Sequence, residues 1–143
     1  MSVPLTLALA AGSASAHAPA PDPVVGTWLV QQPAAPFPLH LYVFNADHTV
    51  QQANPDAGDP HTSDSDGKGA WRRKGSKVSG KWVEIMADRT THKLSGHGEF
   101  TFTVTVAADR LTGAGMFTGY DADGKVVAGP IDAPFTGTRI SAP

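Results

Sequence analysis

The sequence contains no cysteine, which excludes a disulfide scaffold, a thiolate metal site and a cysteine nucleophile. An excess of charge of one sign is also missing, because 11 Lys and Arg residues nearly balance 13 Asp and Glu residues and leave a net charge of -2. Proteins that bind nucleic acid by neutralising phosphates need a basic surface, so no nucleic-acid partner is predicted. The apolar run near the N-terminus is too short for a membrane span.

The composition favours strands over helices. Val and Thr together supply 25 residues, whereas Leu and Ile supply 11, and β-branched residues are enriched in strands. A chain of 143 residues and 14.9 kDa is expected to form one domain. A chain of this mass buries roughly two-thirds of its unfolded surface, which is enough for a core without disulfide support.

The head of the chain differs from the rest, because its first 21 residues include no Asp, Glu, Lys or Arg. Residues 5–16 (LTLALAAGSASA) form an apolar run that ends in small residues, and residues 14–16 resemble a signal cleavage site. No Lys or Arg precedes this run, so an export signal and an uncleaved Ala-rich arm both stay open. The protein is secreted or periplasmic in the first case and cytoplasmic in the second. We predict a signal-like or disordered arm over residues 1–23 and a folded domain over residues 24–143.

The body of the chain reads as short strands joined by turns, with no amphipathic helix. Residues 98–106 alternate apolar and polar side chains, which predicts a half-buried antiparallel strand. Residues 55–68 have no apolar period and are predicted to be irregular. Pro130 and Pro134 interrupt the last strand, which we expect to be bulged or partly an edge. The predicted strands cover residues 24–32, 39–45, 49–54, 69–74, 77–87, 98–106, 111–120 and 125–140.

This strand order predicts an all-β fold, an eight-stranded up-and-down antiparallel barrel. Consecutive hairpins remove their open edges when the sheet closes on itself. We prefer the barrel to a two-sheet sandwich because consecutive hairpins need no long crossover connections. The interior of an eight-stranded barrel is either filled by side chains or holds one small ligand.

Short motifs in four segments carry a resemblance to a known family. Gly26-Thr27-Trp28 stands on the first predicted strand and Thr136–Arg139 on the last, with FNADHTV at residues 44–50 and GAWRR at residues 69–73 between them. Together they resemble the small bacterial lipocalin-like (calycin) barrels over residues 24–141. The resemblance implies that Trp28 closes the barrel floor and that Arg139 lies against its ring, where a guanidinium gains cation–π attraction. Both residues would be structural.

A ligand-binding barrel needs inward-facing apolar side chains and a few polar groups. A filled core without a cavity stays open as the alternative. The predicted ligand-binding residues are Tyr42, Phe44, Trp71, Trp82, Met86, Phe100, Phe102 and Phe117.

Glu84 is the most informative polar residue, since it shares one strand face with Trp82 and Met86. In an apolar barrel its carboxylate would be costly to ionise and its pKa would rise. It would then serve as a general acid or base, or anchor a ligand amine or hydroxyl. The opposite face carries Val83 and Ile85, and if that face points inward Glu84 is solvated.

The resulting hypothesis is a lipocalin-like barrel that binds a small apolar molecule. The alternative is a cyclase, isomerase or lyase of an apolar metabolite, with Glu84, Tyr42 or His40 as acid or base and no metal or organic cofactor. A dimeric structural protein with a filled core is the third candidate.

The histidines do not show the compact spacing of metal ligands, so no metal site is predicted. The cluster of His92, His97 and Glu99 is the group worth testing. Residues 39–44 are apolar on both faces of their predicted strand. We therefore expect the N-terminal arm, a loop or a second copy of the chain in a homodimer to cover one face.

Overall fold

The computed structural model describes residues 19–53, 55–56 and 59–143. The signal-like run at residues 5–16 lies outside the described residues. Within the described part no helix is long and apolar enough to cross a membrane. The strands are β1 (Gly26–Gln31), β2 (Leu39–Phe44), β3 (Thr49–Ala53), β4 (Thr62–Asp64), β5 (Gly67–Lys74), β6 (Lys77–Asp88), β7 (Leu94–Ala107), β8 (Arg110–Asp121), β9 (Val126–Asp132) and β10 (Phe135–Arg139).

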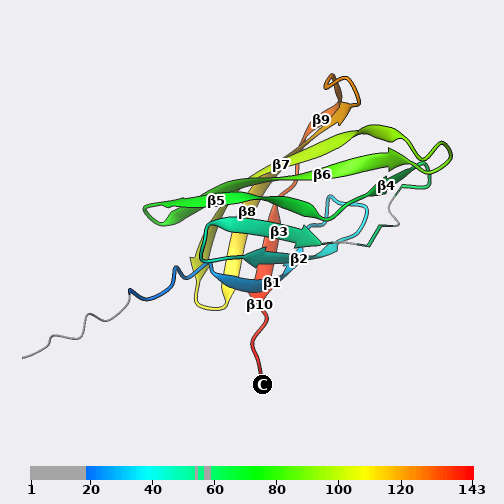
Figure 1. Ribbon diagram of the computed structural model, residues 1–143. Coiled ribbons are helices and arrows are strands. Elements are labelled where there is room, and N and C mark those ends of the chain that lie inside the picture. The colour runs from blue at the N-terminus through cyan, green and yellow to red at the C-terminus, as the bar shows by residue number, and fades with distance from the viewer. Residues whose placement is uncertain (1–18, 54, 57–58) are drawn as a thin grey trace, which may run out of the picture.

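Eight of these strands close into an antiparallel barrel (Figure 1). Neighbours follow the order β1, β2, β3, β5, β6, β7, β8 and β10, and β10 pairs back with β1 through Trp28 and Arg139. The predicted eight-stranded up-and-down barrel is therefore confirmed, and its topology is consistent with a lipocalin-like fold. The two open sheets of a sandwich are excluded because no edge remains between β1 and β10.

The alternation predicted for residues 98–106 is present in β7. Phe100, Phe102 and Val104 are buried and face the barrel interior, whereas the threonines between them face outward. Large rings fit inside because glycines stand opposite them on neighbouring strands. A Cβ on Gly115 would lie 2.0 Å from the Phe100 ring, so this position leaves the ring the space that a side chain would take. Aromatic rings packed over glycines in this way fill the half of the barrel nearest the N-terminus of β1.

The prediction of an irregular segment over residues 55–68 is wrong in part. Residues 62–64 form β4, which pairs with β6 through Thr62↔Asp88 and Asp64↔Met86. β5 begins at Gly67, earlier than predicted, and pairs with β3. The polar sequence of residues 59–67 has no local strand signal, and the extended conformation arises from pairing with a strand more than 20 residues away.

The final predicted strand, residues 125–140, is split into two strands with different neighbours. β9 pairs with the second half of β8, whereas β10 pairs with the first half of β8 and with β1. The chain leaves β9 at Ala133-Pro134. Pro134 has no amide hydrogen and cannot donate to a continuous ladder. β10 thereby closes the barrel, whereas β9 lies beside the second half of β8 (Figure 1).

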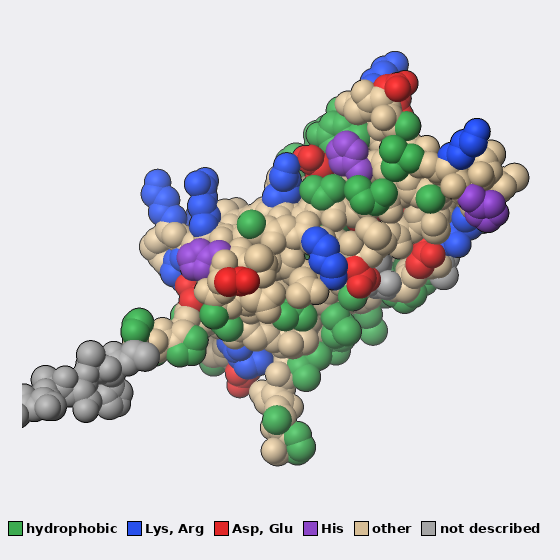
Figure 2. Space-filling model, in the orientation of Figure 1, with side chains coloured by type: hydrophobic (Ala, Val, Ile, Leu, Met, Phe, Trp, Pro, Cys, Tyr) green, Lys and Arg blue, Asp and Glu red, His purple; other side chains and the backbone are tan. Residues whose placement is uncertain are grey.

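The outer face of β1 and β2 carries apolar side chains, as Figure 2 shows. Leu29 and Leu41 are cross-strand partners and are 43% and 42% exposed, and Leu39 is 48% exposed. The arm, loop or second copy that we expected to cover one face of residues 39–44 is not seen among the described residues. Coverage by another copy of the chain stays a prediction.

Candidate functional site

A cavity of about 420 Å³ opens at the end of the barrel opposite Trp28. Its wall combines residues of β2, β4, β6, β8 and β9 with the connection between β1 and β2 and the segment between β3 and β4. The alternative of a filled core without a cavity therefore holds for the half of the interior around Trp28 and not for the half that contains this cavity. The cavity is lined by Gln32, Ala34, Ala35, Pro36, Phe37, His40, Pro55, Asp59, Thr62, Asp64, Trp82, Glu84, Met86, Phe117, Ile131 and Ala133.

Apolar side chains make up most of the cavity wall. Trp82 forms the inner end, where its ring stacks on Phe100 with the centroids 4.9 Å apart. Phe37, Phe117 and Ile131 form the sides. The Pro-rich connection between β1 and β2 supplies part of this wall, held in place by the bond from the Gln32 amide to the Pro38 carbonyl at 2.8 Å. The cavity can therefore exclude water from a small apolar molecule.

Glu84 reaches the cavity from β6. The strand pairs with β5 and β7 such that Trp82 and Glu84 face inward, while Ile85 points outward and is 53% exposed. Glu84 is 6% exposed, and no described residue donates a hydrogen bond to its carboxylate. Burial, together with the negative charge of Asp64, raises the pKa of Glu84 to about 7. This carboxyl therefore holds its proton to a higher pH than an exposed glutamate does.

Asp64 is the second carboxylate on the cavity wall. β4 holds it beside β6, and its backbone amide donates to Asp56 at 2.8 Å. Its Oδ1 atom is fully buried and has no hydrogen-bond partner in the described part of the chain. Burial and the nearby charges of Asp56 and Asp59 raise its pKa above the usual aspartate value. Our sequence analysis did not place Asp64 in the site, because only the long-range pairing of β4 brings it there.

His40 lines the cavity, but both of its ring nitrogens are already engaged. Nε2 lies 2.8 Å from the Phe37 carbonyl oxygen and Nδ1 lies 3.0 Å from Gln52 Nε2. The Gln52 side-chain oxygen in turn accepts a bond from the Gly67 amide at 3.1 Å. These hydrogen bonds require a neutral His40 ring with its proton on Nε2. Burial also lowers the pKa of His40. The chain of bonds ties the β1–β2 connection to β3 and β5, which makes His40 a positioning residue.

Tyr42, the remaining candidate acid or base, lies in the packed core. Its side chain is 0% exposed, and its hydroxyl lies 3.4 Å from the Gln32 side-chain oxygen. Burial raises the pKa of Tyr42 far above its usual range. Among the three candidates, Glu84 is the one that lines the cavity and whose side chain makes no hydrogen bond to another described residue, whereas His40 and Tyr42 are both hydrogen-bonded.

The predicted ligand-binding residues divide into two groups. Trp82, Met86 and Phe117 line the cavity. The other five belong to the packed core below it, and their role in ligand binding stays a prediction. These five are Tyr42, Phe44, Trp71, Phe100 and Phe102.

The closed end of the barrel is built around Trp28. The Arg139 guanidinium carbon lies 4.2 Å from the centre of the indole ring, and its Nη1 donates to the Val25 carbonyl at 2.8 Å. The indole N–H of Trp28 donates to the Val24 carbonyl at 2.8 Å. These contacts join the start of β1 to the end of β10 and keep this end free of solvent.

Within the cluster of His92, His97 and Glu99, His97 Nε2 lies 3.8 Å from Glu99 Oε1, but the three side chains form no metal-binding group. His97 stacks on Tyr120 with the ring centroids 4.6 Å apart, and His92 lies in the turn between β6 and β7. No group of three or more histidine, aspartate or glutamate side chains in the part of the chain that the structure describes has an arrangement that could hold a metal ion.

Comparison with known proteins found no protein family, no curated protein and no solved structure that matches this chain significantly. The barrel topology and the cavity are therefore the observations from which function can be argued.

Proposed function

We propose that this protein binds a small, mainly apolar molecule in the cavity at the open end of its barrel, and that it is a lipocalin-like (calycin) protein. One observation carries the proposal: a cavity of about 420 Å³ walled mostly by aromatic and aliphatic side chains. Transfer of apolar ligand surface from water would supply the binding free energy, at about 25 cal/mol per Å² before the cost of association.

The distribution of packing in the barrel supports this proposal. The closed half is filled by buried rings, including Phe44 and Phe102 with centroids 5.8 Å apart. Such a rigid base supports an open half that needs no large rearrangement to accept a ligand. A barrel that served only as a structural unit would gain stability by filling this space as well.

Binding of Nile red, a neutral apolar dye whose fluorescence rises in apolar surroundings, tests the proposal. Thr62→Trp would place an indole on the cavity wall at β4, and we expect it to abolish the fluorescence rise. Thr101→Trp is the matched control, since this exposed residue lies on the outer face of β7. Equal dye binding by wild type and both variants would place the dye outside the cavity and overturn the proposal.

A second candidate function is acid–base catalysis on a bound apolar substrate, as in a cyclase, an isomerase or a lyase. The observation that favours it is Glu84, whose buried carboxyl has a pKa of about 7 and is well suited to take up and return a proton near neutral pH. Any molecule found to bind is then incubated with wild type and with Glu84→Gln, and its products are separated by chromatography. Turnover by wild type that Glu84→Gln lacks would support catalysis, and equal turnover would remove Glu84 from the mechanism.

A further inference from the structure

The polar part of the cavity wall is acidic and has no counter-charge of its own. Asp59, Asp64 and Glu84 all line the cavity, whereas no Lys or Arg does so among the residues that the structure describes. The remaining titratable group on the wall is His40, whose hydrogen bonds require the neutral ring. Because the charged side chains on the cavity wall are all carboxylates, beside the neutral polar groups Gln32, His40 and Thr62, a neutral or anionic ligand would leave their charge unbalanced.

Two of these carboxylates also lack hydrogen-bond donors. Glu84 is 6% exposed and receives no hydrogen bond from a described residue. The Oδ1 atom of Asp64 is fully buried and unpartnered among the described residues. Buried acceptors are almost always satisfied in folded proteins, so the fully buried Oδ1 atom of Asp64 is an exception, whereas no oxygen of Glu84 is both fully buried and unpartnered.

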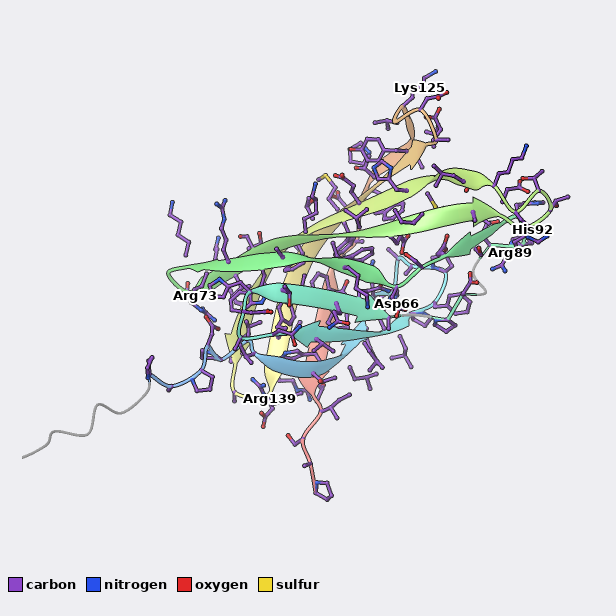
Figure 3. The ribbon with its side chains drawn as sticks, viewed as in Figure 1. Asp66, Arg73, Arg89, His92, Lys125 and Arg139 are labelled. Carbon is purple, nitrogen blue, oxygen red and sulfur yellow. The ribbon has the colours of Figure 1, made fainter. Side chains whose placement is uncertain are left out.

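Arg89 is the cation whose charge acts on Asp64, but its side chain is bound to other groups. Its guanidinium pairs with Asp56 at 2.8 Å and donates to the Asp59 carbonyl at 3.0 Å. It lies just beyond the paired ends of β4 and β6 (Figure 3). Arg89 therefore holds the segment that precedes β4 in place and does not line the cavity.

From this arrangement we propose that the ligand carries a protonated amine, bound between the carboxylates of Glu84 and Asp64 with its apolar part against Trp82 and Phe117. This inference rests on the proposed binding function and names the class of ligand. An ammonium group supplies both the positive charge and the several donors that these carboxylates lack. An alcohol supplies a single donor and no charge, and a carboxylate adds a further negative charge.

The protonation of the site fits this ligand. Burial first, and then the negative charge of nearby Asp64, raise the pKa of Glu84 and favour its protonated form. An entering ammonium group offsets this negative charge and takes the place of the proton. Amine binding should therefore release a fraction of a proton from the protein, which calorimetry in buffers of different ionisation enthalpy detects.

Matched ligands provide the test. Naphthylmethylamine, naphthylmethanol and naphthoate share one ring system and differ in the head group, and octylamine, octanol and octanoate repeat the comparison on a flexible chain. Dissociation constants are measured by calorimetry at neutral pH. We expect each amine to bind at least about tenfold more tightly than its alcohol, and each carboxylate to bind most weakly.

Variants assign the selectivity to named carboxylates. Glu84→Gln and Asp64→Asn should each reduce the ratio between alcohol and amine dissociation constants to within about threefold. Glu99→Gln is the matched control, because this glutamate lies on the outer face of β7 and pairs with Lys81 at 3.2 Å. Its ratio should equal that of wild type.

The outcomes separate this inference from the proposed function. Binding of both scaffolds without head-group preference, or a preference for the carboxylates, would overturn the amine inference and leave apolar binding in place. No binding of any of the six molecules would overturn both. If a variant fails to fold, as judged by circular dichroism, the head-group series on wild type decides the question alone.

Discussion

Gly98 and Glu84 face each other across β7 and β6, and the missing side chain of Gly98 makes room for the carboxylate. A Cβ atom on Gly98 would lie 2.9 Å from Glu84 Oε1 and 2.6 Å from a carbon of the Phe117 ring. Real Cβ contacts are longer than this, so both neighbours depend on a glycine. The absence of a side chain at Gly98 thus allows the Phe117 ring and the Glu84 carboxylate to lie on the same wall of the cavity.

Gly98→Ala should therefore disturb the site directly. The methyl group forces Phe117 or Glu84 to move, and overpacking of this kind costs about 1–3 kcal/mol of unfolding free energy. We expect weaker Nile red binding and a lower urea midpoint. Gly119→Ala is the milder comparison, because its Cβ would lie 3.2 Å from the Ala128 methyl group and 3.7 Å from the Phe117 ring, without the contacts under 3.0 Å that Gly98 would make. Unchanged stability and dye binding in Gly98→Ala would contradict this account.

Glu84→Gln should change the pH dependence of stability. The pKa of Glu84 is about 7 in the folded protein against an ordinary value of 4.5. Between these two pH values the folded state keeps a proton that the unfolded chain has lost, so this group makes stability fall as pH rises and then level off above pH 7. The total loss is about 3 kcal/mol.

Glutamine has no proton to lose, so the variant should match wild type below the lower pKa and be more stable by about 3 kcal/mol above the higher one. Urea unfolding at a series of pH values measures the difference. Asp59, Asp64 and His40 also line the cavity, but they are present in both proteins. The difference between the two curves therefore reports mainly Glu84, and a difference that is constant with pH would refute the assignment.

Asp22 should contribute stability with the opposite pH dependence. Its carboxylate accepts a bond from Arg73 Nη2 at 2.6 Å and another from the Val24 amide at 2.9 Å, which anchors the segment before β1 to β5. The Arg73 hydrogen bonds hold the pKa of Asp22 below its usual value of 3.8. This contribution is complete at neutral pH and is lost as pH falls through the lowered pKa.

Asp22→Asn should accordingly cost about 1 kcal/mol at neutral pH and nothing in strong acid, where the wild-type carboxyl is also neutral. Thermal unfolding across the acid range shows this convergence. Asp123→Asn serves for comparison, since Asp123 is an exposed residue of the turn between β8 and β9. Equal losses at all pH values in Asp22→Asn would show that the ion pair is not responsible.

Arg139→Met should weaken the closed end of the barrel without changing the cavity. The substitution keeps an apolar stem but removes the guanidinium from the Trp28 ring and from the Val25 carbonyl. We expect a loss of about 1–3 kcal/mol of unfolding free energy and unaltered dye affinity. Asp109→Asn tests the ion pair alone and should cost less than about 1 kcal/mol, because the Asp109 side chain is 72% exposed. A stable Arg139→Met variant would show that the stacking is incidental.

Sequence patterns predicted the barrel because its main determinants are local. Alternation along residues 98–106, and the short turn that separates the predicted strands 39–45 and 49–54, require only neighbouring side chains and backbone angles. His48 adopts a positive φ of 70° in the turn between β2 and β3, and its ring stacks on Trp71 with centroids 4.6 Å apart. Eight such strands joined by short turns leave few topologies other than closure.

The candidate site could be predicted only in part, since both faces of residues 77–87 carry large apolar side chains. Trp82 and Met86 alternate with Val83 and Ile85, so hydrophobicity along the strand does not indicate which face is buried. The register with β5 and β7 settles this and turns Glu84 inward. A shift of one residue would have exposed the same glutamate to solvent.

The sequence by itself thus determined most of the strands and their order of pairing around the barrel, whereas β4 and the division of residues 125–140 into β9 and β10 appeared only in the structure. Tertiary structure alone decided that one half of the barrel is filled and the other open, and that Asp64 lies in the open half. β4 has a polar sequence, Thr62–Asp64, and is extended because β6 offers it free backbone groups. Local propensity cannot report such pairing, because its free energy comes from hydrogen bonds to a strand distant in the chain.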